Sequence, residues 1–365
     1  MLGGGVTLAA EAARYIHPLR IGNLELANNL TLAPMAGYTN VAFRLIAKEV
    51  GGCGLVASEM VAAMAPEHAK HEQRFRVLTA TVPAERPIAM QVYGRNPEWC
   101  ADLARRLADA GADMVDLNCG CPVRKATQNG CGVALMKEPQ QIEAILRAMR
   151  AAVPERPVTV KMRLGANQHQ QTVLEVARRA EDAGVDAIFI HARTGESKHG
   201  QPVDLEPVAA VKAAAGVPVI VNGSMDTAAA IRRAKDEAGV DGYQIGRAAC
   251  GDPWLFRNLI AELKGEPLHQ PSLDERRQLL ERHFDLILQL FGEERGVRVM
   301  RKYTFFYCQG LPGVRAFRER FVRIANSADF AQVVEEFFSQ LQDRLDAGQE
   351  LVPDADADQI LIQEG

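Results

Sequence analysis

The sequence contains no long hydrophobic run, no basic segment ahead of an apolar stretch at its start, and little excess of either charge. Of its 365 residues, 47% are hydrophobic and 24% are charged, which is typical of globular proteins rather than membrane or disordered ones. The first residues, MLGGGVTLAAEAARYIHPLR, do not resemble a secretory signal, so we expect a cytoplasmic protein. The net charge of −4 gives no overall sign of nucleic-acid binding, and any such function must depend on a local patch.

Paired C-x-x-C motifs are also absent, although the chain has seven cysteines. Cys119, Cys121 and Cys131 follow a C-x-C-x9-C spacing that is not a standard zinc or iron–sulfur arrangement, so we expect no metal. An odd cysteine count in a cytosolic chain argues against a disulfide framework. Cys121 stands between Gly120 and Pro122 in an expected loop, where a thiol can be presented as a general acid. The other four, Cys53, Cys100, Cys250 and Cys308, are expected to be small buried hydrophobic residues.

Short apolar segments alternate eight times with amphipathic helical patterns. The expected strands cover residues 30–35, 54–60, 87–94, 114–120, 157–164, 187–193, 218–224 and 242–248. Eight such βα units predict a TIM (β/α)8 barrel, an α/β fold with a closed parallel sheet. A doubly wound open sheet is the alternative.

The strand signal stops after Leu263, and the sequence then predicts a small C-terminal helical domain. The expected organisation is an N-terminal extension (1–16), a barrel (17–263), a linker (264–271), a helical domain (272–350) and an acidic tail (351–365). Ser272, with acidic residues in the turn that follows it, is a typical helix start.

Polar residues stand where most of the predicted strands end, which is where TIM barrels carry their chemistry. The segments VNGSMDTAA and IGRAACGDP follow the seventh and eighth strands, the usual phosphate-binding loops of this fold. Gly223, Gly246 and Arg247 would let backbone N–H groups and a guanidinium approach the anion. Each segment also fits an ordinary turn. As a pair they favour a phosphorylated cofactor, and flavin mononucleotide (FMN) fits best with the Lys, Gln and His around the mouth.

Several motifs of this sequence resemble those of a known enzyme family. The segments LAPMAGYTNVAFR, MQVYG, LNCGCPVRKATQNGCGVALM, VKMRLG, IHART, VIVNGS, IGRAACGDPWLF and RKYTFFYCQG, between about His17 and Asn326, resemble those of the tRNA-dihydrouridine synthases, with the bacterial B-type subgroup most similar. The resemblance implies that NADPH reduces FMN, that reduced flavin transfers hydride to C6 of a flipped-out uracil in tRNA, and that Cys121 protonates C5.

The resemblance also assigns site residues. The candidate cofactor-binding residues are Pro34, Met35, Ala36, Gln91, Lys161, His191, Asn222, Gly223, Ser224, Gly246 and Arg247. The candidate substrate residues are Asn118, Arg163, Arg301 and Lys302. Five positions depart from the family pattern: Ser224 and Asn40 stand where an acid is usual, Tyr303 stands where His is usual, and Cys119 and Cys131 are uncommon in this subgroup.

RNA binding is expected from a local basic patch between Arg298 and Arg323. This segment holds seven Arg or Lys residues and one acid, Glu319, with interleaved aromatic residues that could stack on unpaired bases. A buried aromatic seam between solvated Arg faces is the alternative. Arg44, Arg124 and Lys125 could extend the positive path to the barrel mouth.

Three other functions remain open from the residues alone: an FMN barrel that reduces a free pyrimidine or other small molecule, one that acts on ribosomal RNA, or an RNA-binding module that has kept the barrel but lost activity. We expect a monomer with no membrane association. The sequence does not indicate which uridine is modified or whether NADPH is preferred to NADH.

Overall fold

The computed structural model describes residues 8–64, 72–197 and 200–353. Most of the predicted acidic tail, residues 354–365, and the first seven residues of the predicted N-terminal extension lie outside the described residues. Residues of that extension that are described form helix α1 (Leu8–Tyr15), which packs against helices α9 (Ala228–Ala238) and α11 (Leu255–Lys264).

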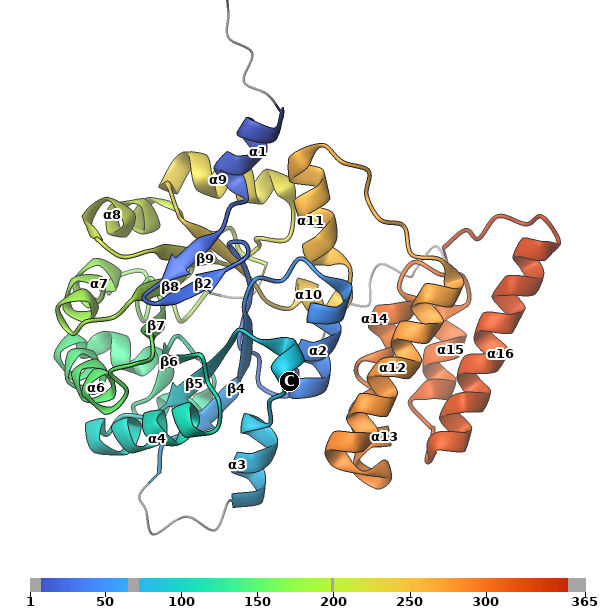
Figure 1. Cartoon of the computed structure of the whole chain (residues 1–365), viewed down its shortest axis with the longest axis horizontal. Helices are drawn as coiled ribbons and strands as arrows, with labels where there is room; N and C mark the ends of the chain where they lie inside the picture. The colour runs from blue at the N-terminus through green and yellow to red at the C-terminus, as the bar shows by residue number, and fades with distance from the viewer. Residues whose placement is uncertain (1–7, 65–71, 198–199, 354–365) are drawn as a thin grey trace, which may run out of the picture.

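Eight parallel strands form a barrel, as the alternation of strand and helix patterns predicts (Figure 1). Their order around the barrel is β3-β10-β9-β8-β7-β6-β5-β4, and a parallel bridge between Thr31 and Leu55 joins the first strand to the last. The strands are β3 (Leu30–Leu32), β4 (Val56–Ala62), β5 (Ile88–Tyr93), β6 (Met114–Cys119), β7 (Val158–Arg163), β8 (Ala187–His191), β9 (Val219–Asn222) and β10 (Gly242–Ile245). Each lies within or overlaps a predicted strand. The TIM barrel prediction is confirmed.

Helices surround the barrel and cover the outer face of the sheet (Figure 1). They are α2 (Val41–Val50), α3 (Glu72–Thr79), α4 (Pro97–Asp109), α5 (Arg124–Thr127), α6 (Pro139–Ala152), α7 (Val173–Asp182), α8 (Glu206–Ala214), α9, α10 (Ala248–Gly251) and α11, with 3-10 turns η2 (Pro83–Glu85) and η3 (Gly132–Lys137). Side-chain caps begin several of them: Asn96 accepts a hydrogen bond from the Trp99 N–H and Thr227 from the Ala230 N–H. These caps place the helix starts directly after the strand ends, where the candidate site lies.

A short antiparallel hairpin, which the sequence patterns did not predict, closes one end of the barrel. Strands β1 (Leu19–Ile21) and β2 (Leu24–Leu26) pair across a turn at Gly22, whose φ is +57°. The hairpin, blue in Figure 1, packs its apolar side chains against the interior residues of the barrel, among them Phe189. Strands of three residues are too short to give a clear alternating pattern.

After α11 the chain contains helices only. They are α12 (Leu273–Phe291), α13 (Glu293–Met300), α14 (Thr304–Cys308), α15 (Val314–Phe321) and α16 (Ser327–Asp346). Helix α12 begins with the predicted cap, since the Ser272 hydroxyl accepts the Glu275 N–H and the Glu275 carboxylate accepts the Ser272 N–H. These helices pack on the barrel through α12 against α2 and α14 against α10.

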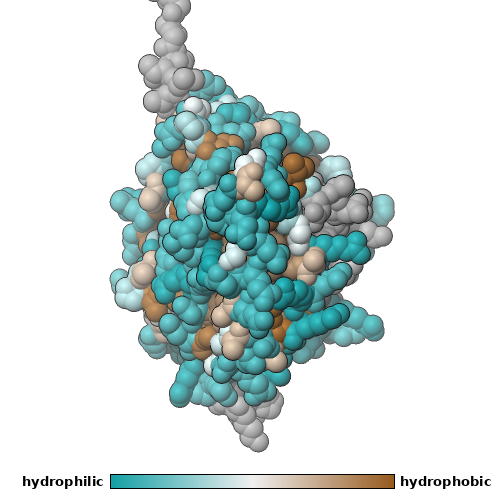
Figure 2. Space-filling view, turned by 90° about the vertical axis from the view of Figure 1, so that its right-hand side faces the viewer, coloured by the Kyte–Doolittle hydropathy of each residue, from teal (hydrophilic) through white to brown (hydrophobic). Residues whose placement is uncertain are grey.

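The outer face of these helices is mostly hydrophilic, and its apolar residues form small separate patches (Figure 2). Within the described ranges, no helix combines the length and the apolar character that crossing a membrane requires.

Candidate functional site

The predicted site residues come together around one end of the barrel, because parallel strands bring their carboxyl ends to the same rim. Each strand after β4 contributes at its end: Gln91 from β5, Asn118 from β6, Lys161 and Arg163 from β7, His191 from β8, Asn222 from β9, and Gly246 with Arg247 after β10. Pro34, Met35 and Ala36 follow β3. Arg301 and Lys302 come from the C-terminal helices instead.

Cys121 is the one partly exposed thiol of the seven, the other six being buried. Its backbone is held on both sides: the N–H donates to Asn118 Oδ1 (3.0 Å), and the carbonyl accepts the Val133 N–H (3.0 Å). Gly132 must be glycine there, because a Cβ at this position would lie 2.5 Å from the Cys121 carbonyl oxygen. The loop therefore presents the Cys121 side chain from a fixed backbone.

Arg163 fixes the residue before Cys121. Its Nε donates to the Gly120 carbonyl (2.8 Å) and its Nη1 to the Thr194 carbonyl (2.7 Å), so the side chain ties the loop after β6 to the end of β8. Burial, followed by the neighbouring Arg193 charge, lowers the pKa of Arg163 to about 10. The cation remains protonated at neutral pH and is 4% exposed.

A buried chain of hydrogen bonds runs beneath the mouth. The Gln91 amide Nε2 donates to Asp116 Oδ2 (2.6 Å), Asn118 Nδ2 donates to Gln91 Oε1 (2.7 Å), and Thr159 Oγ1 donates to Asp116 Oδ1 (2.8 Å). Sequence reasoning missed Asp116. The sequence spacing could have identified it. Asp116 stands two residues before Asn118 on the same strand and therefore faces the same side of the sheet.

Lys161 is the cation inside the mouth. Its Nζ donates to Asn222 Oδ1 (3.1 Å), and Asn222 Nδ2 in turn donates to the Gln244 carbonyl (2.8 Å). Burial lowers the pKa of Lys161, and the negative charge of Asp116 opposes this shift. Burial likewise raises the pKa of Asp116, against its hydrogen bonds from Gln91 and Thr159. Each of these two charges thus favours the charged form of the other.

The loops after β8, β9 and β10 bring two guanidinium groups together, those of Arg193 and Arg247. Arg193 Nη2 donates to Ser224 Oγ (2.7 Å), and the Arg247 charge contributes, after burial, to lowering the pKa of Arg193. Ser224 has φ +52°, the one non-glycine residue in the left-handed region among the described residues. Gly223 packs closely against His191, because a Cβ atom at position 223 would lie 3.0 Å from the imidazole ring. Sequence reasoning gave Arg193 no role, although it stands in the IHART motif.

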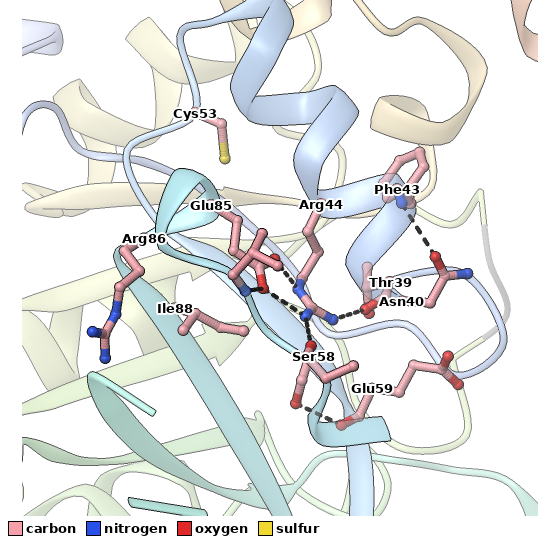
Figure 3. Close-up of polar contacts among 12 residues, drawn as sticks. Thr39, Asn40, Phe43, Arg44, Cys53, Ser58, Glu59, Glu85, Arg86 and Ile88 are labelled. Atoms are coloured by element: carbon pink, nitrogen blue, oxygen red, sulfur yellow. Dashed lines mark hydrogen bonds and ion pairs between the residues drawn. The ribbon is translucent and has the colours of Figure 1, made fainter. Parts of the chain in front are cut away.

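The loop between β3 and α2 is supported from below by a buried ion pair (Figure 3). Arg44 and Glu85 are both fully buried, with Arg44 Nε 2.6 Å and Nη2 3.0 Å from the two carboxylate oxygens. Arg44 Nη1 also donates to the Thr39 carbonyl (2.6 Å). The expectation that Arg44 extends a positive path to the mouth is wrong, because its charge is neutralised inside the protein.

The same loop is held from above by Tyr303 of the C-terminal helices. Asn40 Nδ2 donates to the Tyr303 hydroxyl (2.9 Å), and this hydroxyl donates to the Tyr38 carbonyl (2.6 Å). Asn40 Oδ1 accepts the Phe43 N–H and so begins α2. Two of the departures from the family pattern, Asn40 and Tyr303, are thus direct partners. The Lys302 ammonium lies 4.8 and 4.9 Å from the Tyr38 and Tyr303 ring centroids.

Replacing Tyr303 by phenylalanine is expected to loosen the loop at residues 35–40. The change leaves the buried Asn40 amide without its acceptor, at a cost of about 1–3 kcal/mol. Hydrogen exchange of the backbone amides in this loop, followed by mass spectrometry, should accelerate by about tenfold or more.

Tyr307→Phe is the matched control, because Tyr307 is also buried, four residues further along on α14, but its hydroxyl lies 2.7 Å from His283 Nδ1 on α12. This control should leave exchange at residues 35–40 unchanged. Equal acceleration in both variants would show that Tyr303 acts only through general packing.

The segment between Arg298 and Arg323 is less available to a nucleic acid than its sequence indicates. Tyr303, Phe306 and Tyr307 are buried, so the interpretation that they stack on unpaired bases is wrong for these three rings. Arg301 Nη2 donates to the Ile324 carbonyl. Three other cations of the segment form ion pairs, namely Arg298–Glu294, Arg315–Glu319 and Arg320–Glu336. Arg124 and Lys125, just after Cys121, are exposed.

The fold is similar to that of several solved structures. A solved old yellow enzyme homologue from Zymomonas mobilis is 14% identical with a TM-score of 0.51, covering 72% of this chain and 95% of that one. A 2-naphthoyl-CoA reductase gives 15% identity and a TM-score of 0.53 over 70% of this chain and 53% of that one. At such low identity the similarity shows the barrel fold alone.

Sequence relatives are more informative. The tRNA-dihydrouridine synthase B of Pseudomonas aeruginosa is 36% identical over 325 residues, 89% of this chain and 97% of the relative. The enzyme of the same name from Klebsiella pneumoniae is 34% identical over 321 residues, 88% of this chain and 99% of the relative. The family model described as dihydrouridine synthase matches residues 31–342, which include the barrel mouth and most of the C-terminal helices. The chain therefore belongs to the dihydrouridine synthase family.

Proposed function

We propose that this protein reduces uridine in tRNA to 5,6-dihydrouridine, with FMN as the bound cofactor and NADPH as the reductant. The observation that carries the proposal is the partly exposed Cys121 thiol, presented from a fixed backbone at a barrel mouth lined with amides and cations. The tRNA-dihydrouridine synthase names of its relatives support the substrate and the reaction.

The residues at the mouth fit FMN. Arg193 and Arg247 are close enough to depress the pKa of Arg193, and a phosphate between them would relieve this repulsion. Gly223, packed against His191, and the partly exposed Gly246 lie in the loops where TIM barrels usually bind phosphate. Lys161 supplies a positive charge deeper in the mouth, suited to a ring system that becomes anionic on reduction. We propose Pro34, Met35, Ala36, Gln91, His191, Asn222 and Ser224 as further cofactor contacts.

In the proposed mechanism, bound flavin supplies the hydride that is added at C6 of the uracil. The Cys121 Sγ–H gives its proton to C5, and the resulting thiolate is reprotonated from solvent before the next turnover. The loop bonds from Asn118 and Arg163 hold the thiol in position throughout. A flipped-out base is required, because the hydride donor and the thiol must reach opposite faces of the C5=C6 bond.

The C-terminal helices are proposed to bind the tRNA. We propose the division into an extension (1–16), barrel (17–263), linker (264–271), helical RNA-binding domain (272–350) and tail (351–365). Since Arg301 and several neighbouring cations already have protein partners, phosphate contacts are better assigned to exposed cations of this region such as Arg323 and to Arg124 and Lys125 beside the thiol. Lys302, between the helices and the loop after β3, is proposed to contact RNA near the mouth.

The test is to incubate the purified protein and NADPH with tRNA that lacks dihydrouridine and to measure dihydrouridine by mass spectrometry of nucleosides. We expect dihydrouridine at a defined position and a yellow protein whose flavin is FMN. A flavin-loaded protein that NADPH reduces but that leaves tRNA unchanged would contradict the substrate. Ribosomal RNA and free uracil, assayed in parallel, would then identify the alternative.

A further inference from the structure

Asp116 lies in the barrel interior and has no place in the mechanism above, although it is at the centre of the hydrogen-bond chain beneath the mouth. It is 5% exposed, and each of its carboxylate oxygens accepts one side-chain hydrogen bond, from Gln91 and from Thr159. A carboxylate only accepts hydrogen bonds, so its presence decides the direction of every bond that follows it.

The direction of the chain can be followed atom by atom. Because Gln91 must donate through Nε2 to Asp116, its Oε1 faces Asn118 and accepts from Asn118 Nδ2. Asn118 Oδ1 then faces the loop and accepts the backbone N–H groups of Gly120 (3.1 Å) and Cys121 (3.0 Å). A flipped Gln91 amide would place two N–H groups against each other at Asn118. The carboxylate at one end and the backbone donors at the other thus agree on a single arrangement.

Two consequences for the site follow. Gln91 keeps its second Nε2 hydrogen, so the group it offers to a ligand is a donor suited to a carbonyl oxygen. Asn118 keeps its oxygen for the loop, so the backbone of Cys121 stays held while ligands enter and leave.

We propose that Asp116 is a positioning residue that fixes the amide orientations of Gln91 and Asn118, and through Asn118 the position of the Cys121 loop. This inference rests on the proposed function insofar as Gln91 contacts the flavin and Cys121 is the proton donor. The surroundings of Asp116 favour the charged form that this role requires. Thr159 and Gln91 donate hydrogen bonds to its carboxylate, and the Lys161 cation on the neighbouring strand stabilises its negative charge.

The test compares Asp116→Asn with Asp116→Leu in the full-length protein. In Asp116→Asn, the new Oδ1 still accepts from Gln91, and the new Nδ2 donates to Thr159 Oγ1, which changes from donor to acceptor. Asp116→Leu keeps the branched arrangement of heavy atoms but has no acceptor. Four quantities are measured: kcat and KM with tRNA, the dissociation constant of FMN from fluorescence titration of the apoprotein, and the rate at which iodoacetamide alkylates Cys121 in the apoprotein.

We expect Asp116→Leu to lower kcat by about 10- to 100-fold, weaken FMN binding and change the Cys121 alkylation rate, with KM for tRNA unchanged. Asp116→Asn should restore all of these to within about threefold of the wild type. Wild-type values in Asp116→Leu would overturn the inference. A loss in Asp116→Asn equal to that in Asp116→Leu would overturn it too, since charge rather than hydrogen-bond direction would then matter.

If Asp116→Leu does not fold, Thr159→Val serves in its place. It keeps the volume and removes one of the two bonds that hold Asp116, so smaller losses in the same direction are expected and wild-type values would refute the inference. A wild-type protein that makes no dihydrouridine would count against the proposed function alone, because the FMN and alkylation measurements still report on Asp116.

Discussion

Replacing Cys121 by alanine is expected to lower the rate of dihydrouridine formation by about 10²- to 10⁴-fold, the usual contribution of a general acid. FMN affinity and the rate of flavin reduction by NADPH should not change, because the Cys121 bonds to Asn118 and Val133 are made by its backbone and persist in alanine. The decisive measurement is a single turnover in which prereduced enzyme is mixed with tRNA and flavin reoxidation is followed by absorbance.

Cys131→Ala provides the control. Cys131 is also close in sequence and also a free thiol, but it is buried and its Sγ lies 3.4 Å from the Asn129 carbonyl. Its removal should leave the single-turnover rate at the wild-type level. If the alanine variant at Cys121 kept the wild-type rate, another group would have to deliver the proton, and the Cys121 assignment would be abandoned.

Replacing Glu85 by alanine is expected to destabilise the protein by about 3–5 kcal/mol, because it leaves the fully buried Arg44 guanidinium without a counter-charge. Urea unfolding followed by circular dichroism measures the loss. The loop between β3 and α2, which we propose contacts FMN, should also be less well ordered. Arg44 donates to the Thr39 carbonyl, and Thr39 Oγ1 accepts the Met35 N–H. FMN affinity should therefore fall together with stability.

Two comparisons make this prediction specific. Glu237→Ala breaks an exposed pair with Arg233 on α9 and should cost less than about 1 kcal/mol. The double variant Arg44→Met, Glu85→Leu removes both buried charges and should recover much of the stability lost by Glu85→Ala. A Glu85→Ala protein as stable as Glu237→Ala would mean that water or another group compensates Arg44.

The order of elements and the location of the site could be predicted because their signals are local. Each barrel strand is a run of apolar, often β-branched residues followed by a helical pattern, and the polar residue that ends it stands directly in the sequence. Cys121 was identifiable as the presented thiol from Gly120 and Pro122 beside it. The prediction that Cys53, Cys100, Cys250 and Cys308 are buried is also confirmed, whereas the burial of Cys119 and Cys131 was not predicted.

Pairings between distant residues were decided by the tertiary structure. The sequence predicts that Arg44 is an available cation, whereas the structure pairs it in the interior with Glu85, 41 residues away. Tyr303 reads as part of an RNA-stacking set until its hydroxyl meets Asn40, 263 residues away. Asp116 is one acid in an apolar strand until Gln91 and Thr159 on the two neighbouring strands donate to it. Local patterns report which face of an element is buried, whereas the partner of a buried polar group depends on which elements the closed barrel places side by side.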